Sequence, residues 1–239
     1  MNYNEFNSTA NSRDRELEMA SAFPVLMRKV YTWMALALVI TGVTAYGVAN
    51  SPAVLEVLYT NPIVFWVLAA AELGIVFYTS ARINRLSLST ATILFLLFSI
   101  INGATLSSIF IVYTMSSIAK VFFITAGTFA VMAVIGTTTK RDLSRMGSIM
   151  MMALIGIIIA GIVNIFVKSS MFDFIICIVG VLLFVGLTAW DAQKIRLMLE
   201  DAPDAGESAQ KIALLGALSL YLDFINLFIH LLRLLGNRN

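Results

Sequence analysis

The sequence has little of several residue types, and each shortage excludes a class of protein. Only 13% of its 239 residues are charged, whereas a soluble globular domain carries about a quarter. Cys177 is the single cysteine, so no intramolecular disulfide can form and a C-x-x-C metal site is excluded. The formal net charge of +2 is too small to indicate nucleic acid as a partner. An integral membrane protein is the class that fits these shortages.

Apolar residues are abundant where charged ones are scarce: 59% of the chain is hydrophobic, and the mean hydropathy is +0.90. A helix crosses the hydrocarbon core of a bilayer in about 20 apolar residues. Seven such runs occur, with approximate limits 30–50, 62–81, 88–113, 118–139, 147–167, 172–196 and 211–235. We therefore predict an all-α integral membrane protein in which residues 30–239 form a single domain of seven transmembrane helices.

Two polar segments flank or interrupt these runs. Residues 1–29 begin with "MNYNEFNSTANSRDRELEM", which is poor in aliphatic residues and predicts a disordered or surface-lying cytoplasmic tail. Because the first apolar run follows this tail, we do not expect it to be a cleavable signal peptide. The stretch 200–208, "EDAPDAGES", contains a proline and a glycine and predicts a polar loop between the last two helices.

The positions of lysine and arginine predict the orientation, because cytoplasmic loops carry an excess of both. With the N-terminus in the cytoplasm, that side holds Arg13, Arg15, Arg28, Lys29, Arg82, Arg85, Lys140, Arg141, Arg145, Lys194, Arg196 and Lys211. The far side then keeps Lys120, Lys168, Arg233 and Arg238. A last helix that re-enters would return Arg233 and Arg238 to the cytoplasm, but we expect a full crossing.

The last apolar run carries its less apolar residues on one face. These residues are Gly216, Ser219, Asp223, Asn226, His230 and Arg233. Their spacings of three and four residues place them within an arc of about 100° on a helix. A stripe of this kind cannot face lipid at low cost, so we expect it to face other helices or water.

Two further acids lie within apolar runs. Asp191 stands near the cytoplasmic end of the sixth run, in "GLTAWDAQKI". Glu72 lies deep in the second run, with Thr79 on the same face and Arg82 near the cytoplasmic mouth. Ionisable residues within a membrane are rare and commonly functional, so both acids are candidates for a site.

The stretch "LSLYLDFINLFIHLLRLLG" resembles the last-helix signature of the Bax inhibitor family of membrane proteins, in a bacterial-type member. Weaker features extend the resemblance over most of the chain. They are the glutamate of the second run with basic residues after it, the basic loop "GTTTKRDLSRMG", an "NIF" at 164–166, and Asp191 followed by Gln193.

The resemblance implies a seven-helix fold with a central last helix between two layers of three, in the bacterial inner membrane. It also implies a pH-sensitive calcium leak in which Asp191 and Asp223 form a hydrogen-bonded pair. A second-helix arginine then acts as a latch on that pair. In the family pattern this arginine stands eleven residues after the glutamate, where this sequence has Ile83. We assign the latch to Arg82, which shares the Glu72 face, with Arg85 as the alternative.

Two carboxylates placed close together can share one proton and titrate as a unit. Such a pair holds two helices together while protonated, and it can act as a pH gate. The pair is also a weak calcium site, to which Asn226 adds an oxygen, although calcium usually takes six to eight. We expect Glu72 and Asn226 to line the ion path. The expected partners are the bilayer, calcium ions and protons; calcium is the transported ion, and no cofactor is expected.

Two other functions fit part of the pattern. A regulatory protein that binds a membrane partner, such as a membrane protease, is the first alternative. An intramembrane aspartyl protease is the second, but the G-x-G-D and P-A-L motifs of those enzymes do not occur here. We therefore expect no enzymatic activity, and the sequence alone leaves the oligomeric state open.

Overall fold

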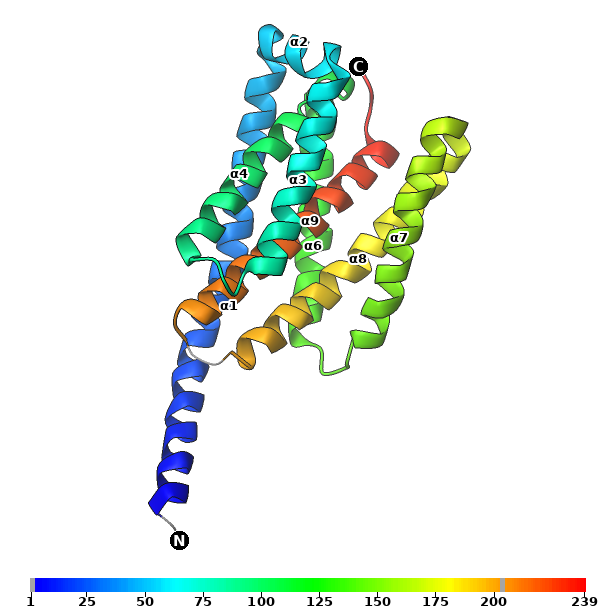
Figure 1. Ribbon diagram of the computed structural model, residues 1–239. Helices are drawn as coiled ribbons and strands as arrows, with labels where there is room; N and C mark the ends of the chain where they lie inside the picture. Colours follow the sequence, from blue (N-terminus) through cyan, green and yellow to red (C-terminus); the bar gives the residue numbers. More distant parts are fainter. Residues whose placement is uncertain (1–2, 203–204) are drawn as a thin grey trace.

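A computed structural model describes residues 3–202 and 205–239, and helices account for most of these residues (Figure 1). The described helices are α1 (Tyr3–Ala49), α2 (Pro52–Thr60), α3 (Pro62–Arg82), α4 (Leu88–Leu106), α5 (Ser108–Val112), α6 (Met115–Thr138), α7 (Ser144–Val167), α8 (Ser170–Glu200) and α9 (Glu207–Leu235).

Within the described residues, seven helical segments are long and apolar enough to cross a membrane, which confirms the predicted fold class. The third combines α4 and α5, and the first is the part of α1 from Ser21 to Ala49. The short helix α2 was not predicted. Both α8 and α9 extend beyond the predicted limits, and the polar loop predicted at 200–208 lies between the end of α8 at Glu200 and the start of α9 at Glu207.

The start of the chain also differs from its prediction. Residues 1–29 were expected to form a disordered or surface-lying tail, but α1 is one continuous helix from Tyr3 onward. Figure 1 shows that its first turns project beyond the bundle, past the end that holds the α8–α9 connection. Disorder was therefore wrong for residues from Tyr3 onward, because polar residues are compatible with a helix that continues an apolar one, where nucleation costs nothing further.

Most connections between the helices are short and contain a residue that caps the next helix. Ser87, Thr114 and Ser169 each accept a hydrogen bond from a backbone amide in the first turn of α4, α6 and α8. At α7, Asp142 accepts bonds from Ser144, and these bonds lower the pKa of the Asp142 carboxyl. The α7–α8 turn requires a left-handed residue, and Lys168 adopts it with a φ of 53°.

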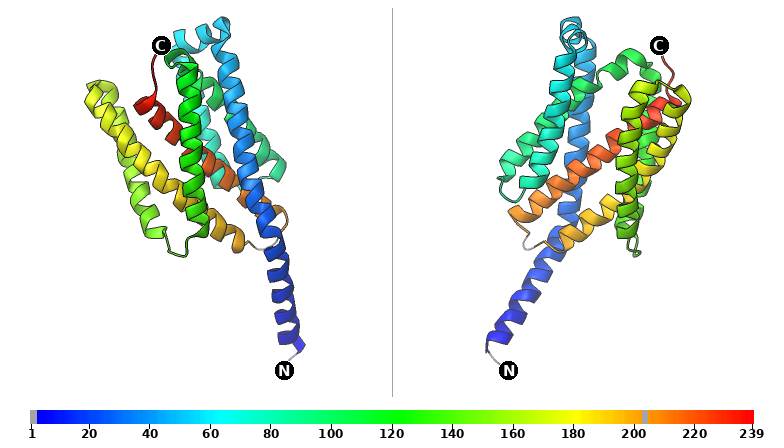
Figure 2. Two further views of the ribbon diagram at one scale, coloured as in Figure 1. Left: turned by 180° about the vertical axis from the view of Figure 1, so that it is seen from behind. Right: turned by 45° about the vertical axis from the view of Figure 1, so that its right-hand side comes forward.

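The last helix lies at the centre of the bundle. α9 packs against α1, α4, α6 and α8, and it crosses the molecule obliquely between them (Figure 2). The outer helices α3 and α7 pack mainly on α4 and α8, respectively. Close approach depends on small residues: a Cβ on Gly136 of α6 would collide with the backbone of Ala189.

The C-terminus lies at the end of the bundle opposite the α8–α9 connection (Figure 1). Backbone hydrogen bonds fix it there, from Thr114 to the Asn237 carbonyl at 3.1 Å and from Asn239 to the Val112 carbonyl at 3.0 Å. The last helix therefore crosses the bundle fully, as the sequence analysis favoured. Arg233 and Arg238 lie at the end away from the α8–α9 connection.

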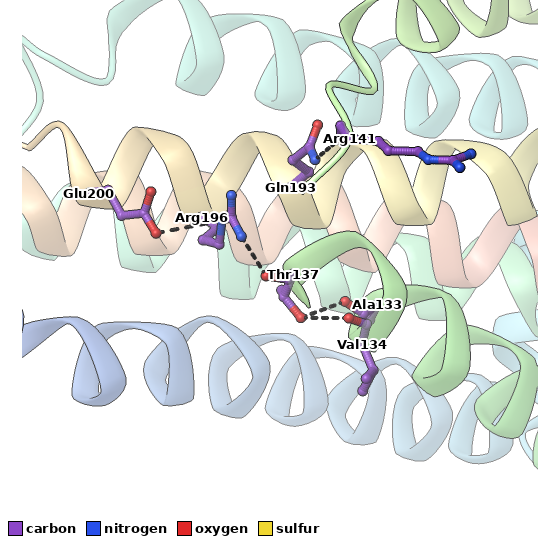
Figure 3. A network of polar contacts seen from close by, with 7 residues as sticks. All are labelled: Ala133, Val134, Thr137, Arg141, Gln193, Arg196 and Glu200. Carbon is purple, nitrogen blue, oxygen red and sulfur yellow. Dashed lines mark hydrogen bonds and ion pairs between the residues drawn. The ribbon is translucent and has the colours of Figure 1, made fainter. Parts of the chain in front are cut away.

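Partly buried polar contacts fix the end of α8 against the α6–α7 loop (Figure 3). Gln193 donates to the Arg141 carbonyl at 2.7 Å and accepts from the Leu143 amide at 2.8 Å. One turn further, Arg196 donates to the Thr137 carbonyl at 2.8 Å. Because Gln193 is 4% exposed and lies two residues after Asp191, these contacts hold the part of α8 that carries the acid.

Candidate functional site

Asp191 of α8 and Asp223 of α9 line the same cleft, which has a volume of about 660 Å³. The two carboxyl groups are close enough to interact electrostatically. The walls come from α3, α7, α8 and α9. The lining residues are Leu73, Met151, Leu154, Ile157, Ile158, Gly161, Ile176, Phe184, Leu187, Trp190, Asp191, Lys194, Ser219, Leu222, Asp223, Asn226, His230 and Arg233.

The register of the α8–α9 hairpin explains how the two acids come to line one cleft, although among the described residues the hydrogen bond that the resemblance had implied does not join the two carboxyl groups. A Cβ on Gly180 would touch His230, and one on Gly216 would touch Ile195. In an antiparallel pair, each step forward along α8 is matched by a step backward along α9. Counting from these two facing pairs, Asp191 lies opposite positions 219 and 220 of α9. Asp223 then stands about one helical turn beyond, which is a rise of roughly 5 Å.

The direction of the side chains narrows this gap. A Cα–Cβ bond tilts toward the N-terminus of its own helix. In an antiparallel pair the two tilts oppose each other, so the side chains of Asp191 and Asp223 lean toward one another along the helix axes. The sequence alone gave Asp223 a depth that was difficult to reconcile with Asp191. The hairpin register and the oblique course of α9 remove that difficulty.

Asp223 is the more deeply buried of the two acids. It is 5% exposed, and no donor in residues 21–202 and 205–239 reaches its Oδ2 atom, which is itself buried. Asp191 is half-buried, and the Lys194 ammonium group lies within electrostatic range of it. An unpartnered buried carboxylate is costly, so Oδ2 requires either a proton or a cation.

The cleft offers only part of a calcium coordination shell. Besides the two acids, Ser219 and Asn226 present polar atoms, and the Asn226 amide donates to its own helix at the Leu222 carbonyl (2.8 Å). Within the described chain no group of three or more His, Cys, Asp or Glu side chains could hold a metal. This donor set suits brief occupation by a hydrated cation better than tight binding.

An ion pair stands at the far end of the cleft, and sequence reasoning missed one of its partners. Arg233 of α9 pairs with Asp173 in the first turn of α8, and Asn164 of α7 also donates to Asp173, at 3.5 Å. A second cavity, of about 250 Å³, adjoins this pair and shares Gly161, Ile176 and Arg233 with the main cleft. In the sequence, the feature that could have identified Asp173 is its place four residues after Ser169, the N-cap residue of α8.

The structure does not bring Glu72 to this cleft. Its carboxylate accepts a hydrogen bond from Thr105 at 2.7 Å and one from Asn102 at 3.3 Å, both on α4. Tyr221 of α9 donates to Asn102 at 3.0 Å, and its hydroxyl is bonded to Thr41 of α1 at 2.6 Å. Glu72 therefore belongs to a polar network on the other side of α9, and Tyr221 is a member that the stripe analysis missed.

The two candidate latch residues also lie away from the acids. Arg82 and Arg85 are exposed at the end of α3 and beyond it, and neither lines the cleft. Ile83, at the position where the family pattern has arginine, is 9% exposed. The cation placed near Asp191 is instead Lys194, whose ammonium group also lies 5.0 Å from the Trp190 ring centre.

Comparison with known proteins gives consistent relatives. Residues 24–239 match the family model described as "Inhibitor of apoptosis-promoting Bax1". The inner membrane protein YbhL of Escherichia coli K12 is 47% identical over 226 residues, which cover 94% of this chain and 97% of the relative. An uncharacterized protein of Borreliella burgdorferi is 45% identical, with 89% and 91% covered. One of Rickettsia prowazekii is 43% identical, with 89% of each chain covered.

Proposed function

The chain belongs to the Bax inhibitor family, and on that premise we propose that it is a pH-sensitive calcium leak gated by Asp191 and Asp223. The observation that carries the proposal is the buried Asp223 Oδ2, which has no donor among the described residues and lies beside a second acid. When such a carboxyl group gains or loses a proton, the net charge inside the cleft changes. The same group can be neutralised by a passing cation.

The gate follows from the chemistry of two close carboxyl groups. With one proton bound, a single negative charge is shared, and α8 and α9 remain packed along their hairpin. When that proton leaves, two like charges face each other in a poorly solvated cleft, and their repulsion favours separation of the helices. We therefore expect flux to rise as the pH rises through the titration of the pair.

The cation path runs along the cleft between α7, α8 and α9. Lys194 stands at the end near the α6–α7 loop, and the Arg233–Asp173 ion pair stands at the other end. Asn226 and Ser219 provide oxygen atoms between these ends. An incomplete donor set allows the ion to leave as readily as it enters, which suits a leak.

The proposed location is the bacterial inner membrane, with the N-terminus in the cytoplasm. The E. coli relative is named an inner membrane protein, and the excess of lysine and arginine on one side supports the orientation. In this orientation Asp191 is nearer the cytoplasmic mouth, and the Arg233–Asp173 pair faces the other side of the membrane.

The test is calcium flux into proteoliposomes between pH 5 and pH 8. Asp191→Asn and Asp223→Asn keep the side-chain shape but remove the titrating charge, so each should flatten the pH dependence. The double variant should add little to either single one, because coupled sites are not additive. Asp142→Asn, on the exposed α6–α7 loop, is the matched control and should keep the wild-type profile. If both single variants of the pair also keep it, the pair is not the sensor.

A further inference from the structure

A further cavity, of about 490 Å³, lies between α1, α4 and α9, near the beginnings of α4 and α9. It shares no lining residue with the cleft of the two acids. Its lining residues are Val25, Arg28, Lys29, Thr32, Trp33, Leu88, Thr92, Gln210 and Ala213. Figure 1 shows these three helices meeting at the end of the bundle that carries the α8–α9 connection.

The cavity carries two adjacent positive charges. Neither Arg28 nor Lys29 has a carboxylate partner in residues 21–202 and 205–239. Lys29 donates to the Gln210 side chain at 3.3 Å, which directs the ammonium group across to α9 and leaves its other hydrogens available. Glu207, an acid at this end of the bundle, is paired with Lys211 at 2.9 Å and accepts from the Leu88 amide at 3.3 Å. The cavity therefore keeps a net positive charge.

The other walls are apolar or carry hydroxyl groups. Trp33 is half-buried on the wall, Val25 is exposed beside it, and Thr32 and Thr92 add hydroxyl groups. Tryptophan is enriched at the boundary between head groups and acyl chains of a bilayer. A cationic side next to an aromatic and aliphatic side matches a ligand with a phosphate at one end and a hydrocarbon at the other.

We propose that this cavity binds the head group of one anionic phospholipid, with the phosphate at Arg28 and Lys29 and the glycerol and upper acyl chain against Trp33. Basic cavities between transmembrane helices on the cytoplasmic side are typical sites for anionic head groups. A free phosphate would use the two cations but would leave the apolar wall unoccupied. The combination of both walls therefore favours a lipid over a soluble anion.

Native mass spectrometry of the purified chain tests the proposal directly. Wild-type protein should retain phosphatidylglycerol in preference to phosphatidylcholine. The Arg28→Gln/Lys29→Gln variant should bind phosphatidylglycerol about thirtyfold more weakly, as expected for two charges near a membrane surface. Lys140→Gln/Arg141→Gln is the matched control, because it removes two exposed charges outside the cavity. Equal losses in both variants, or no loss in either, would overturn the proposal.

A second measurement leaves the two cations intact. In a Trp66→Phe/Trp190→Phe background, Trp33 is the remaining tryptophan. Phosphatidylglycerol brominated on its acyl chain should quench its fluorescence at least severalfold more strongly than brominated phosphatidylcholine at the same fraction of lipid. Inorganic phosphate at millimolar concentration should not relieve the quenching. Equal quenching by the two lipids, or relief by phosphate, would show that no anionic lipid is selected there.

Discussion

Two opposite faces of α9 carry polar groups, and they differ in how these groups are partnered. Tyr221 and Asp223 are two residues apart, so they point in directions about 160° apart around the helix. On the Tyr221 side, the Glu72 carboxylate accepts two hydrogen bonds, and the tyrosine hydroxyl is bonded to Asn102 and Thr41. On the other side, Asp223 Oδ2 is buried without a donor in the described chain.

In the proposed leak, this difference separates a structural group from a titrating one. A satisfied network ties α1, α3, α4 and α9 together, and any change in it removes a bond. A buried carboxylate without a donor carries a desolvation cost that no protein group offsets. Binding of a proton or a cation removes this cost, so the helix that carries the acid is sensitive to both. Glu72 and Asp223 are both acids within apolar runs, and they differ in that donors reach the first while none in the described chain reaches Oδ2 of the second.

The largest expected effect concerns the satisfied face. Tyr221 is fully buried and packs edge-on against Phe95 and Phe98, with ring centres 6.0 and 5.7 Å away. Tyr221→Ala should lower the free energy of unfolding by about 3–5 kcal/mol through the cavity it leaves. Tyr221→Phe should cost about 1 kcal/mol, because only hydrogen bonds are lost. Denaturant unfolding in detergent measures both changes, and Tyr78→Phe on the exposed surface of α3 serves as the control.

The second prediction concerns the unsatisfied face and has the opposite sign. Asp223→Asn should raise the free energy of unfolding at pH 8 by about 1–2 kcal/mol, because a buried group that lacks a donor loses its charge. The same unfolding measurement at pH 8 and pH 5 tests it, and the gain should shrink at the lower pH. A loss of stability similar to that of Tyr221→Phe would mean that the two faces do not differ.

A smaller effect is expected at the far end of the cleft. Asp173→Asn weakens the ion pair with Arg233. The side chains of Asp173 and Arg233 are 28% and 37% exposed, so losing the pair should lower the free energy of unfolding by at most about 1 kcal/mol. If the pair narrows the path, basal calcium flux should rise up to about fivefold, while its pH dependence should stay as in the wild type. Flux that is unchanged in magnitude would place this ion pair outside the path.

The smallest effect is expected from the latch assignment. Arg82→Ala should raise basal flux by only about twofold, because an exposed charge with no ion-pair partner among the described residues contributes little. Arg85→Ala is the matched control, since it removes the same charge three residues away. A larger rise in the Arg85 variant than in the Arg82 variant would transfer the latch to Arg85.

The candidate site was predictable in part. Asp191 and Asp223 stood out because charge within an apolar run is costly wherever the run folds. Asp173 and Tyr221 did not stand out. An acid near the start of a helix and a tyrosine among leucines have ordinary structural explanations, and both acquired their roles through contacts with residues far away in the sequence. Glu72 was assigned to the ion path from its depth alone, but the structure places its partners on α4.

The sequence by itself determined that this is a seven-helix membrane protein, because hydrocarbon excludes any unsatisfied backbone and each crossing requires its own apolar run. It also determined that α9 carries a polar stripe, since a helix has a fixed angular period. Only the tertiary structure decided that Glu72 stays outside the cleft that Asp191 and Asp223, the pair implied by the resemblance, line together. Pairing depends on the register of the α8–α9 hairpin, set by close contacts at Gly180 and Gly216, and on the oblique course of α9. Side-chain periodicity describes the face of one helix, whereas register and tilt are properties of two helices in contact.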